Sequence, residues 1–178
     1  MNNPETEIRQ LMQADDPAAL EKIYCYAGRE LYAYLVGLTG SGVEAEDLLS
    51  ELFVKVAVRR RQVAKSAAIR AYLYRMATNL AYDRERQERR RERRQQEYAA
   101  FRVMGSPPPA PESEEMLRQL RRGLAELPVE QREAVVMKTY LDKTFAEIAV
   151  LTEVSVNTVI SRYRYALKKL KNYLERRL

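Results

Sequence analysis

Three carboxylates in the first third of the chain have the spacing needed to bind a divalent cation. Glu44, Asp47 and Glu51 follow one another at intervals of three and four residues, which places them on one face of a helix. Carboxylates arranged in this way can hold magnesium, as in all-helical enzymes that hydrolyse nucleotides. Such a site also needs carboxylates from a second helix, and the nearest candidates, around Glu85, are embedded among arginines. A solvated or partner-binding acidic face is the better interpretation, and an assay of magnesium-dependent hydrolysis would test the enzyme alternative.

The composition excludes several other kinds of chemistry. The 178 residues contain no histidine, so Ser-His and Cys-His nucleophiles and His-ligated metal sites cannot form. The single cysteine, Cys25, cannot form an internal disulfide, and its place in an apolar helical pattern predicts a core residue. Apolar runs are too short for a membrane span, and the first residues lack the pattern of a secretion signal. We therefore expect a cytoplasmic, non-enzymatic protein with no catalytic residues, metal, cofactor or membrane contact.

Charge is distributed unevenly along the chain. Residues 1–58 contain ten Asp or Glu and four Lys or Arg, a net charge of −6. Residues 59–94 contain 13 Lys or Arg and four Asp or Glu, a net charge of +9, and residues 128–178 carry +4. Basic segments within helices indicate nucleic acid, whereas the acidic segment indicates a different, basic partner.

Residues 70–94 combine tyrosines with arginines on one long predicted helix. Aromatic rings stack on unpaired bases and cations neutralise phosphates, so this mixture is typical of single-stranded DNA binding. The pattern leaves open a solvated helix whose tyrosines are half-buried. The candidate DNA contacts in this segment are Arg70, Tyr72, Tyr74, Arg75, Asn79, Arg84 and Arg86.

Residues 144–173 have the pattern of a helix-turn-helix, with a short helix to Leu151, a turn through Val154 and a longer helix from Ser155. Thr144 and Ser155 can each cap the helix that follows. An apolar stripe on the second helix predicts its buried face, and the opposite polar and basic face suits a major groove. A helical hairpin with a solvated basic face is the alternative. The candidate base and phosphate contacts are Asn157, Thr158, Ser161, Arg162, Arg164, Tyr165 and Lys168.

The elements that must position these residues are all predicted to be helices. Apolar residues recur at helical spacing before and after Gly105–Pro111, whose four prolines cannot continue a helix. Arg59–Ser66 has no clear periodicity and is expected to form a loop. We predict an all-α fold of two small helical domains, residues 1–95 and 114–178, joined by a flexible proline-rich linker over residues 96–113.

A one-component repressor would also carry a helix-turn-helix, after a sensing N-terminal domain. It would need a ligand pocket and usually a dimer interface that matches a two-fold operator. The linker and the arginine-rich helix argue against this alternative, although the sequence leaves it open.

Three ordered motifs give the chain a resemblance to a known family. They are Glu44–Phe53, then Tyr72–Asp83, then Leu127–Glu133 running into Phe145–Ala149 and Thr158–Arg162. In order and spacing the sequence resembles the extracytoplasmic-function (ECF, group IV) sigma factors of bacterial RNA polymerase. The resemblance covers nearly the whole chain after about residue 15.

The resemblance implies a sigma factor that binds core RNA polymerase and directs promoter-specific transcription initiation. The first domain would bind the polymerase clamp helices and capture the unwound minus-ten element, and the second would bind the flap and read the minus-thirty-five element. An anti-sigma factor is a further partner that the sequence does not identify. The segment Arg59–Ser66 matches the loop that takes a flipped base, and Tyr72, Arg75 and Asn79 match the minus-ten face. The recognition helix matches at Asn157, Thr158, Ser161, Arg162 and Tyr165. The clamp-binding positions match at Glu46, Asp47, Leu48, Glu51 and Leu52.

Three positions depart from the family pattern. Ala57 stands where tryptophan is frequent, Glu153 where the turn usually has glycine, and Ile160 where a basic residue is common. A left-handed backbone at the turn would strain glutamate but not glycine. Ile160 falls at the edge of the buried stripe and offers no phosphate contact. We expect the second domain to bind DNA weakly on its own.

Overall fold

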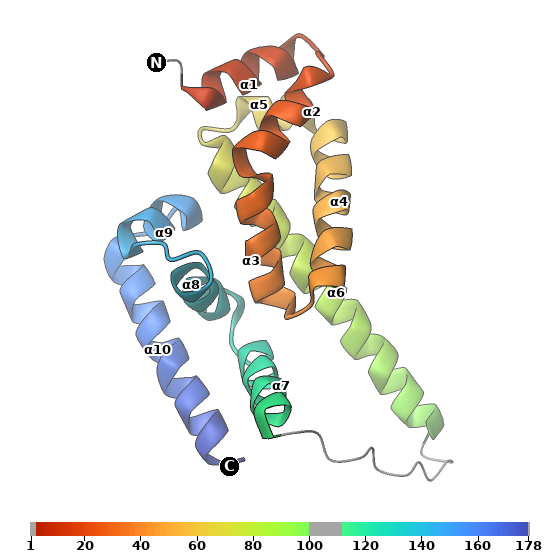
Figure 1. Cartoon of the computed structure of the whole chain (residues 1–178), viewed down its shortest axis with the longest axis vertical. Coiled ribbons are helices and arrows are strands. Elements are labelled where there is room, and N and C mark those ends of the chain that lie inside the picture. Colours follow the sequence, from red (N-terminus) through yellow and green to blue (C-terminus); the bar gives the residue numbers. More distant parts are fainter. Residues whose placement is uncertain (1–2, 100–111, 178) are drawn as a thin grey trace.

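The computed structural model describes residues 3–99 and 112–177, and within these ranges every regular element is a helix (Figure 1). The N-terminal unit consists of α1 (Pro4–Gln13), α2 (Ala18–Ile23), the π-helix η1 (Tyr24–Gly28), α3 (Arg29–Thr39), α4 (Gly42–Val58), α5 (Arg60–Lys65) and α6 (Ile69–Ala99). The C-terminal unit consists of α7 (Glu112–Ala125), α8 (Val129–Thr139), α9 (Phe145–Thr152) and α10 (Val156–Glu175). The predicted all-α fold with a C-terminal helix-turn-helix is confirmed.

Side-chain caps fix where three of these helices begin. The Ser41 hydroxyl accepts a hydrogen bond from the backbone amide of Glu44 at 3.3 Å, which starts α4. Thr144 and Glu147 form a complete capping box at the start of α9. Ser155 accepts from the amide of Thr158 at 3.1 Å and starts α10. These caps satisfy amides that have no partner inside the helix, so the boundaries of the helix-turn-helix follow from local sequence.

Two short helices of the N-terminal unit, α1 and α5, differ from what the sequence predicted. Helix α1 was not predicted, yet its residues Ile8 and Met12 are fully buried. The segment Arg59–Ser66, predicted as a loop, contains α5, whose Val63 and Ala64 are buried against α1. Arg9 of α1 joins the two segments by donating to the backbone carbonyl oxygen of Ala64 at 3.2 Å. A six-residue helix with two buried side chains is too short for periodicity to reveal it.

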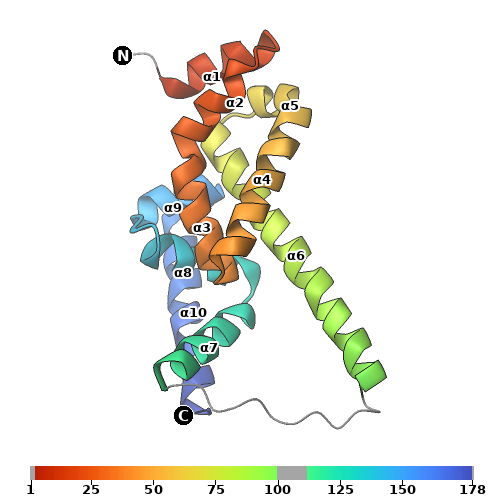
Figure 2. The same ribbon diagram turned by 45° about the vertical axis from the view of Figure 1, so that its right-hand side comes forward.

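Helix α6 is the longest element and extends past the predicted domain boundary. It has 31 residues, which at 1.5 Å per residue is a rod about 47 Å long. It reaches Ala99 rather than ending at residue 95, and its second half projects away from the body of the protein (Figure 2). The predicted linker core, Gly105–Pro111, lies outside the described residues.

The two units share one apolar core. A single cluster of buried side chains joins Leu35, Leu48 and Leu73 of the N-terminal unit to Val136 and Ile148 of the C-terminal unit. Helix α8 packs on α3, and α9 packs on α6 (Figure 1). The C-terminal unit is therefore docked on the N-terminal unit, which the sequence analysis did not predict.

None of the helices in residues 3–99 and 112–177 has the length and apolar character that crossing a bilayer requires.

Candidate nucleic-acid interface

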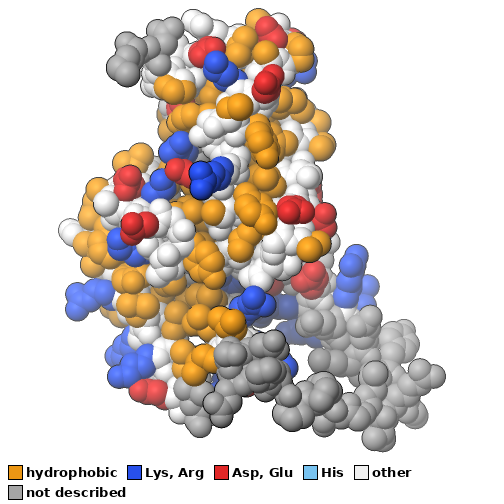
Figure 3. Space-filling model, viewed as in Figure 1, with side chains coloured by type: hydrophobic (Ala, Val, Ile, Leu, Met, Phe, Trp, Pro, Cys, Tyr) orange, Lys and Arg blue, Asp and Glu red, His pale blue; other side chains and the backbone are white. Residues whose placement is uncertain are grey.

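The outward face of α4 is acidic, and part of it was predicted correctly. Glu46 and Asp47 are exposed, and Figure 3 shows acidic side chains gathered along the edge of the molecule over α4. Glu51 is half-buried and pairs with Lys55 at 3.0 Å and with Arg84 at 3.5 Å. Leu48 and Leu52 are fully buried in the core. The prediction that these two leucines contact a partner is wrong, because they belong to the opposite, apolar face of the helix.

An apolar groove that the sequence analysis missed lies beside this acidic face. Tyr24, Tyr32, Leu49 and Phe53 line it, and the Tyr24 and Phe53 rings lie 5.4 Å apart between centroids. Cys25 also lines the groove and is exposed, so its prediction as a core residue is wrong. The physical reason is the π-helix η1, whose wider turn breaks the 3.6-residue period from which burial was inferred.

No group of three or more His, Cys, Asp or Glu residues that could hold a metal ion occurs among the residues that the structure describes.

Three of the predicted DNA contacts share one face of α6. Tyr72 is partly exposed, and Arg75 and Asn79 are exposed. These residues follow one another at intervals of three and four, and the Arg75 guanidinium lies 5.5 Å from the centre of the Tyr72 ring. A ring, a cation and an amide in one row can bind the base and phosphate of an unpaired nucleotide.

Tyr74 does not belong to this face. It is 1% exposed, its ring packs on Tyr34 with centroids 5.0 Å apart, and its hydroxyl donates to Glu30 at 3.1 Å. Burial raises the pKa of Tyr74 well above its ordinary value. The prediction that Tyr74 contacts DNA is wrong, because its ring is held inside the N-terminal unit.

The remaining basic candidates of α6 differ in their contacts. Arg70 donates to the carbonyl oxygen of Tyr26 at 3.2 Å and pairs with Glu30 at 3.5 Å, so it ties α6 to η1 and α3. Arg84 is half-buried beside Glu51. Arg86 is exposed on the projecting half of the helix.

The second candidate surface is the outward face of α10. Asn157, Thr158, Ser161, Arg164, Tyr165 and Lys168 are exposed, and Arg162 is half-buried. Figure 3 shows Lys and Arg side chains along the edge of the molecule over α10. The inward stripe holds Val159, Ala166 and Leu170, whereas Val156 and Leu167 are 41% and 43% exposed.

Glu153 lies at the turn of the helix-turn-helix and adopts the left-handed conformation that strains a residue other than glycine. Its backbone is left-handed, with φ 56° and ψ 38°, and its side chain is exposed. Its carboxylate pairs with the guanidinium of Arg75 at 2.7 Å, across the boundary between the two units. Ile160 is half-buried, as expected at the edge of the stripe.

The two predicted DNA-reading surfaces therefore meet at one place. Arg75 and Asn79 of α6 and Arg162 of α10 line a single cleft of about 230 Å³. Glu130, Glu133 and Glu153 line the same cleft. Burial raises the pKa of Glu133, and the effect outweighs the hydrogen bonds that Thr78 and Tyr34 donate to the carboxylate.

Comparison with known proteins assigns both units. Residues 24–91 match the family described as Sigma-70 region 2, and residues 117–170 match Sigma-70, region 4. The chain is 26% identical over 175 residues to the ECF RNA polymerase sigma factor SigW of Bacillus subtilis, covering 91% of this chain and 93% of that protein. It is 31% identical over 168 residues to SigE of Mycolicibacterium smegmatis, covering 91% of this chain and 63% of that protein. The chain belongs to the ECF sigma factors.

Solved structures support the fold of this sigma factor. CnrH, solved in complex with the cytosolic domain of CnrY, has a TM-score of 0.65 at 18% identity, and the match covers 97% of this chain and 98% of CnrH. The sigma factor RpoE of Bartonella quintana, crystallised with the anti-sigma factor NepR, has a TM-score of 0.55 at 21% identity and covers 87% and 96%. Region 2 corresponds to most of the N-terminal unit and region 4 to the C-terminal unit.

Proposed function

We propose that this sigma factor, which acts in promoter-specific transcription initiation, divides the task between its two units. The N-terminal unit binds core RNA polymerase and captures the unwound minus-ten element. The C-terminal unit binds the polymerase flap and reads the minus-thirty-five element. We further propose that the protein is a group IV member, acts in the cytoplasm where polymerase and promoters are found, and is not an enzyme.

The observation that carries the polymerase assignment is the exposed acidic face of α4. Glu46 and Asp47 point outward, and Figure 1 places α4 on the side of the N-terminal unit away from α8 and α9. Two exposed carboxylates suit a basic helix pair such as the polymerase clamp, because complementary charge guides association and selects the partner. The neighbouring groove with Tyr24 and Phe53 offers the apolar contact that charges alone do not supply.

The DNA assignments rest on the two polar faces already described. Tyr72, Arg75 and Asn79 offer stacking, charge and hydrogen bonding within one row on α6. The outward face of α10 offers amide and hydroxyl groups for base edges and cations for phosphates.

An anti-sigma factor is a further proposed partner of this chain. The proposal is supported by the likeness in fold to a sigma factor that was solved with an anti-sigma factor, and to CnrH, which was solved with the cytosolic domain of CnrY.

Co-elution with core polymerase tests the first assignment. Glu46→Lys with Asp47→Lys reverses the acidic face without touching a buried residue, and we expect this double variant to lose co-elution and promoter-dependent transcription. Glu51→Lys is a less specific change because Glu51 also pairs with Arg84. Glu126→Lys with Glu175→Lys, two exposed carboxylates of the C-terminal unit, makes the same change in net charge and is the control. Normal co-elution of a folded Glu46→Lys, Asp47→Lys variant would refute the assignment.

A further inference from the structure

We propose that the second half of α6 is a further DNA-binding surface, which holds the paired DNA immediately upstream of the minus-ten element by its phosphates. The surface is the basic face of this half of the helix, made by four exposed arginines, Arg86, Arg90, Arg93 and Arg94. The proposal rests on the assignment of the minus-ten element to the first half of the same helix.

Arginines and glutamates lie on different sides of this half of α6. Residues 84–94 contain seven arginines. Each residue of an α-helix turns about 100° further around the axis, so Glu85 and Glu88 lie within about 60° of one another. The basic face covers about 100° on the opposite side of the axis. The two kinds of charge are therefore separated around the helix rather than mixed.

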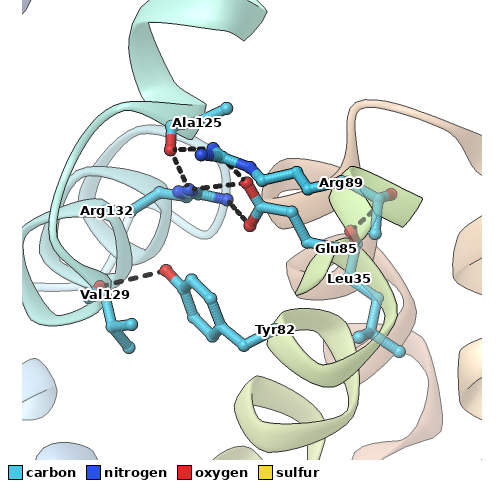
Figure 4. A network of polar contacts seen from close by, with 8 residues as sticks. Leu35, Tyr82, Glu85, Arg89, Ala125, Val129 and Arg132 are labelled. Atoms are coloured by element: carbon cyan, nitrogen blue, oxygen red, sulfur yellow. Dashed lines mark hydrogen bonds and ion pairs between the residues drawn. The ribbon is translucent and has the colours of Figure 1, made fainter. Parts of the chain in front are cut away.

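The acidic side of this half of α6 faces the rest of the protein. Glu85 accepts a hydrogen bond from Arg132 of α8 at 2.8 Å and another from Arg89 at 2.7 Å (Figure 4). Burial and the nearby carboxylate of Glu88 raise the pKa of Glu44, which belongs to α4. The carboxylates thus serve contacts within the protein, and the basic face lies on the side that the fold leaves exposed.

The basic face works against the stability of the helix that carries it. Arg86 and Arg90 are four residues apart, as are Arg90 and Arg94, and like charges at this spacing destabilise a helix. A helix selected only for solubility would gain stability from a glutamate at one member of each pair, because opposite charges attract at the same spacing. Four exposed arginines on one side instead form a surface that binds an anionic partner.

The position of the basic face along the chain selects paired DNA as this anion. Arg90 follows Tyr72 by 18 residues, which is five complete helical turns, so the two residues lie on the same side of α6. The chain continues from the far end of α6 to the C-terminal unit, which is assigned to the element further upstream. The basic face therefore lies upstream of the unwound segment, where the strands are paired and carry one negative charge per about 1.7 Å.

The length of the helix fits a short stretch of duplex. From Asn79 to Arg93 the helix rises about 21 Å, the length of about six base pairs at 3.4 Å each. Asp83 is exposed on this side of the helix and separates the single-strand contacts from the phosphate contacts. Arginine binds phosphate through two parallel hydrogen bonds, and such contacts add affinity without reading the sequence.

Arg90→Gln with Arg93→Gln tests the proposal in the holoenzyme formed with core RNA polymerase. Glutamine preserves the helix propensity and removes both charges. The control is Arg91→Gln with Lys22→Gln, which makes the same change in net charge. Arg91 is exposed beside Arg90 but lies about 100° further around the helix, and Lys22 is an exposed residue of α2.

Two DNA probes of mixed sequence are compared. The first is a single strand of about 12 nucleotides, which tests the first half of α6. In the second, the forked probe, the same strand is joined at its 5′ end, the upstream end, to about ten base pairs of duplex. This duplex is about 34 Å long and does not reach the minus-thirty-five element, so the forked probe tests the basic face without the C-terminal unit.

We expect the Arg90→Gln, Arg93→Gln variant to lose affinity only for the forked probe. The salt dependence of its binding should fall by about two counterions, so the ratio of wild-type to variant affinity should be about 12-fold larger at about 50 mM salt than at about 200 mM. The control variant should match the wild type on both probes. Equal affinities of the two double variants for the forked probe would overturn the proposal. Loss of holoenzyme assembly would also overturn it, because the basic face would then bind polymerase.

Tyr72→Ala separates this proposal from the minus-ten assignment. If that assignment is correct, this variant loses affinity for the single-stranded probe and keeps the gain in affinity that the duplex of the forked probe provides. Unchanged binding of the single-stranded probe would refute the minus-ten assignment. The basic face is judged on the forked probe alone, so the two hypotheses fail on different measurements.

Discussion

Replacing Glu85 by glutamine should weaken the docking of the two units more than its surface position suggests. The side chain of Arg132 is 6% exposed, and Glu85, itself 22% exposed, is its ionic partner at 2.8 Å. In the described chain the Nε atom of Arg132 is buried without a hydrogen-bond partner. Glutamine would keep an acceptor but remove the negative charge, leaving a buried guanidinium that only a carbonyl oxygen and the Tyr82 ring compensate.

The expected loss is about 2 kcal/mol. Removing one partner of a buried ion pair costs about 3–5 kcal/mol, and partial exposure of Glu85 with the remaining amide acceptor reduces this figure. With a urea m-value of about 2 kcal/mol/M, the unfolding midpoint should fall by about 1 M. Circular dichroism at 222 nm on the full chain measures it.

Two further variants decide what causes the change. Glu88→Gln makes the same substitution at an exposed position one turn along α6 and should leave the midpoint within about 0.2 M. Glu85→Gln with Arg132→Met removes both charges and should recover part of the lost stability, since apolar groups often replace buried ion pairs without penalty. Equal midpoints for Glu85→Gln and Glu88→Gln would show that the network contributes nothing to docking.

Three other outcomes follow from the structure. Tyr72→Ala and Asn79→Ala should each impair open-complex formation more than polymerase binding, since a lost stacked base costs about 1–3 kcal/mol; wild-type permanganate footprints would contradict this. Glu153→Gly should relieve roughly 1–2 kcal/mol of left-handed strain, and combined with Ile160→Arg it should raise the affinity for the minus-thirty-five element. The added arginine should also steepen the salt dependence of binding by about one counterion, and binding isotherms at several salt concentrations measure both effects. The pKa of Glu133 is raised above 4.5 in the folded chain, so the folded chain binds this proton more tightly than the unfolded chain does. The free energy of unfolding should therefore increase as the pH falls from neutral toward 4.5. Glu133→Gln should abolish that gain, and a urea midpoint that rises equally in both proteins would contradict it.

The helix-turn-helix was predictable because its boundaries are local. Thr144 and Ser155 cap their own helices, and the strained turn at Glu153 follows from sequence position alone. The exposed residues of α4 and α6 were predicted correctly where each helix has a regular 3.6-residue period. The prediction was wrong for Cys25, because the π-helix η1 shifts that period without a sequence signal that we recognised.

Other wrong predictions assigned a residue to a binding surface from its type or motif alone, although the side chain is buried. Leu48 and Leu52 carry the family motif yet lie in the core, and Tyr74 has a tyrosine's capacity to stack but is enclosed by α3. The docking of the units was not predictable from periodicity, because it depends on contacts between residues far apart in sequence. Gly37 was the available signal, since a glycine inside an otherwise apolar helix often marks close helix approach.

The continuity of α6 determines how the docked form comes apart. Arg75 and Glu85 are ten residues apart on one unbroken helix, so they lie about 15 Å apart on a single rod, with Thr78 between them. All three bind the C-terminal unit, through Glu153, Arg132 and Glu133. A stiff rod cannot bend to release one of these contacts while keeping the others, so we expect no stable half-open intermediate. Separation should be all-or-none, and single-molecule traces of the free chain should show two discrete energy-transfer levels with abrupt transitions.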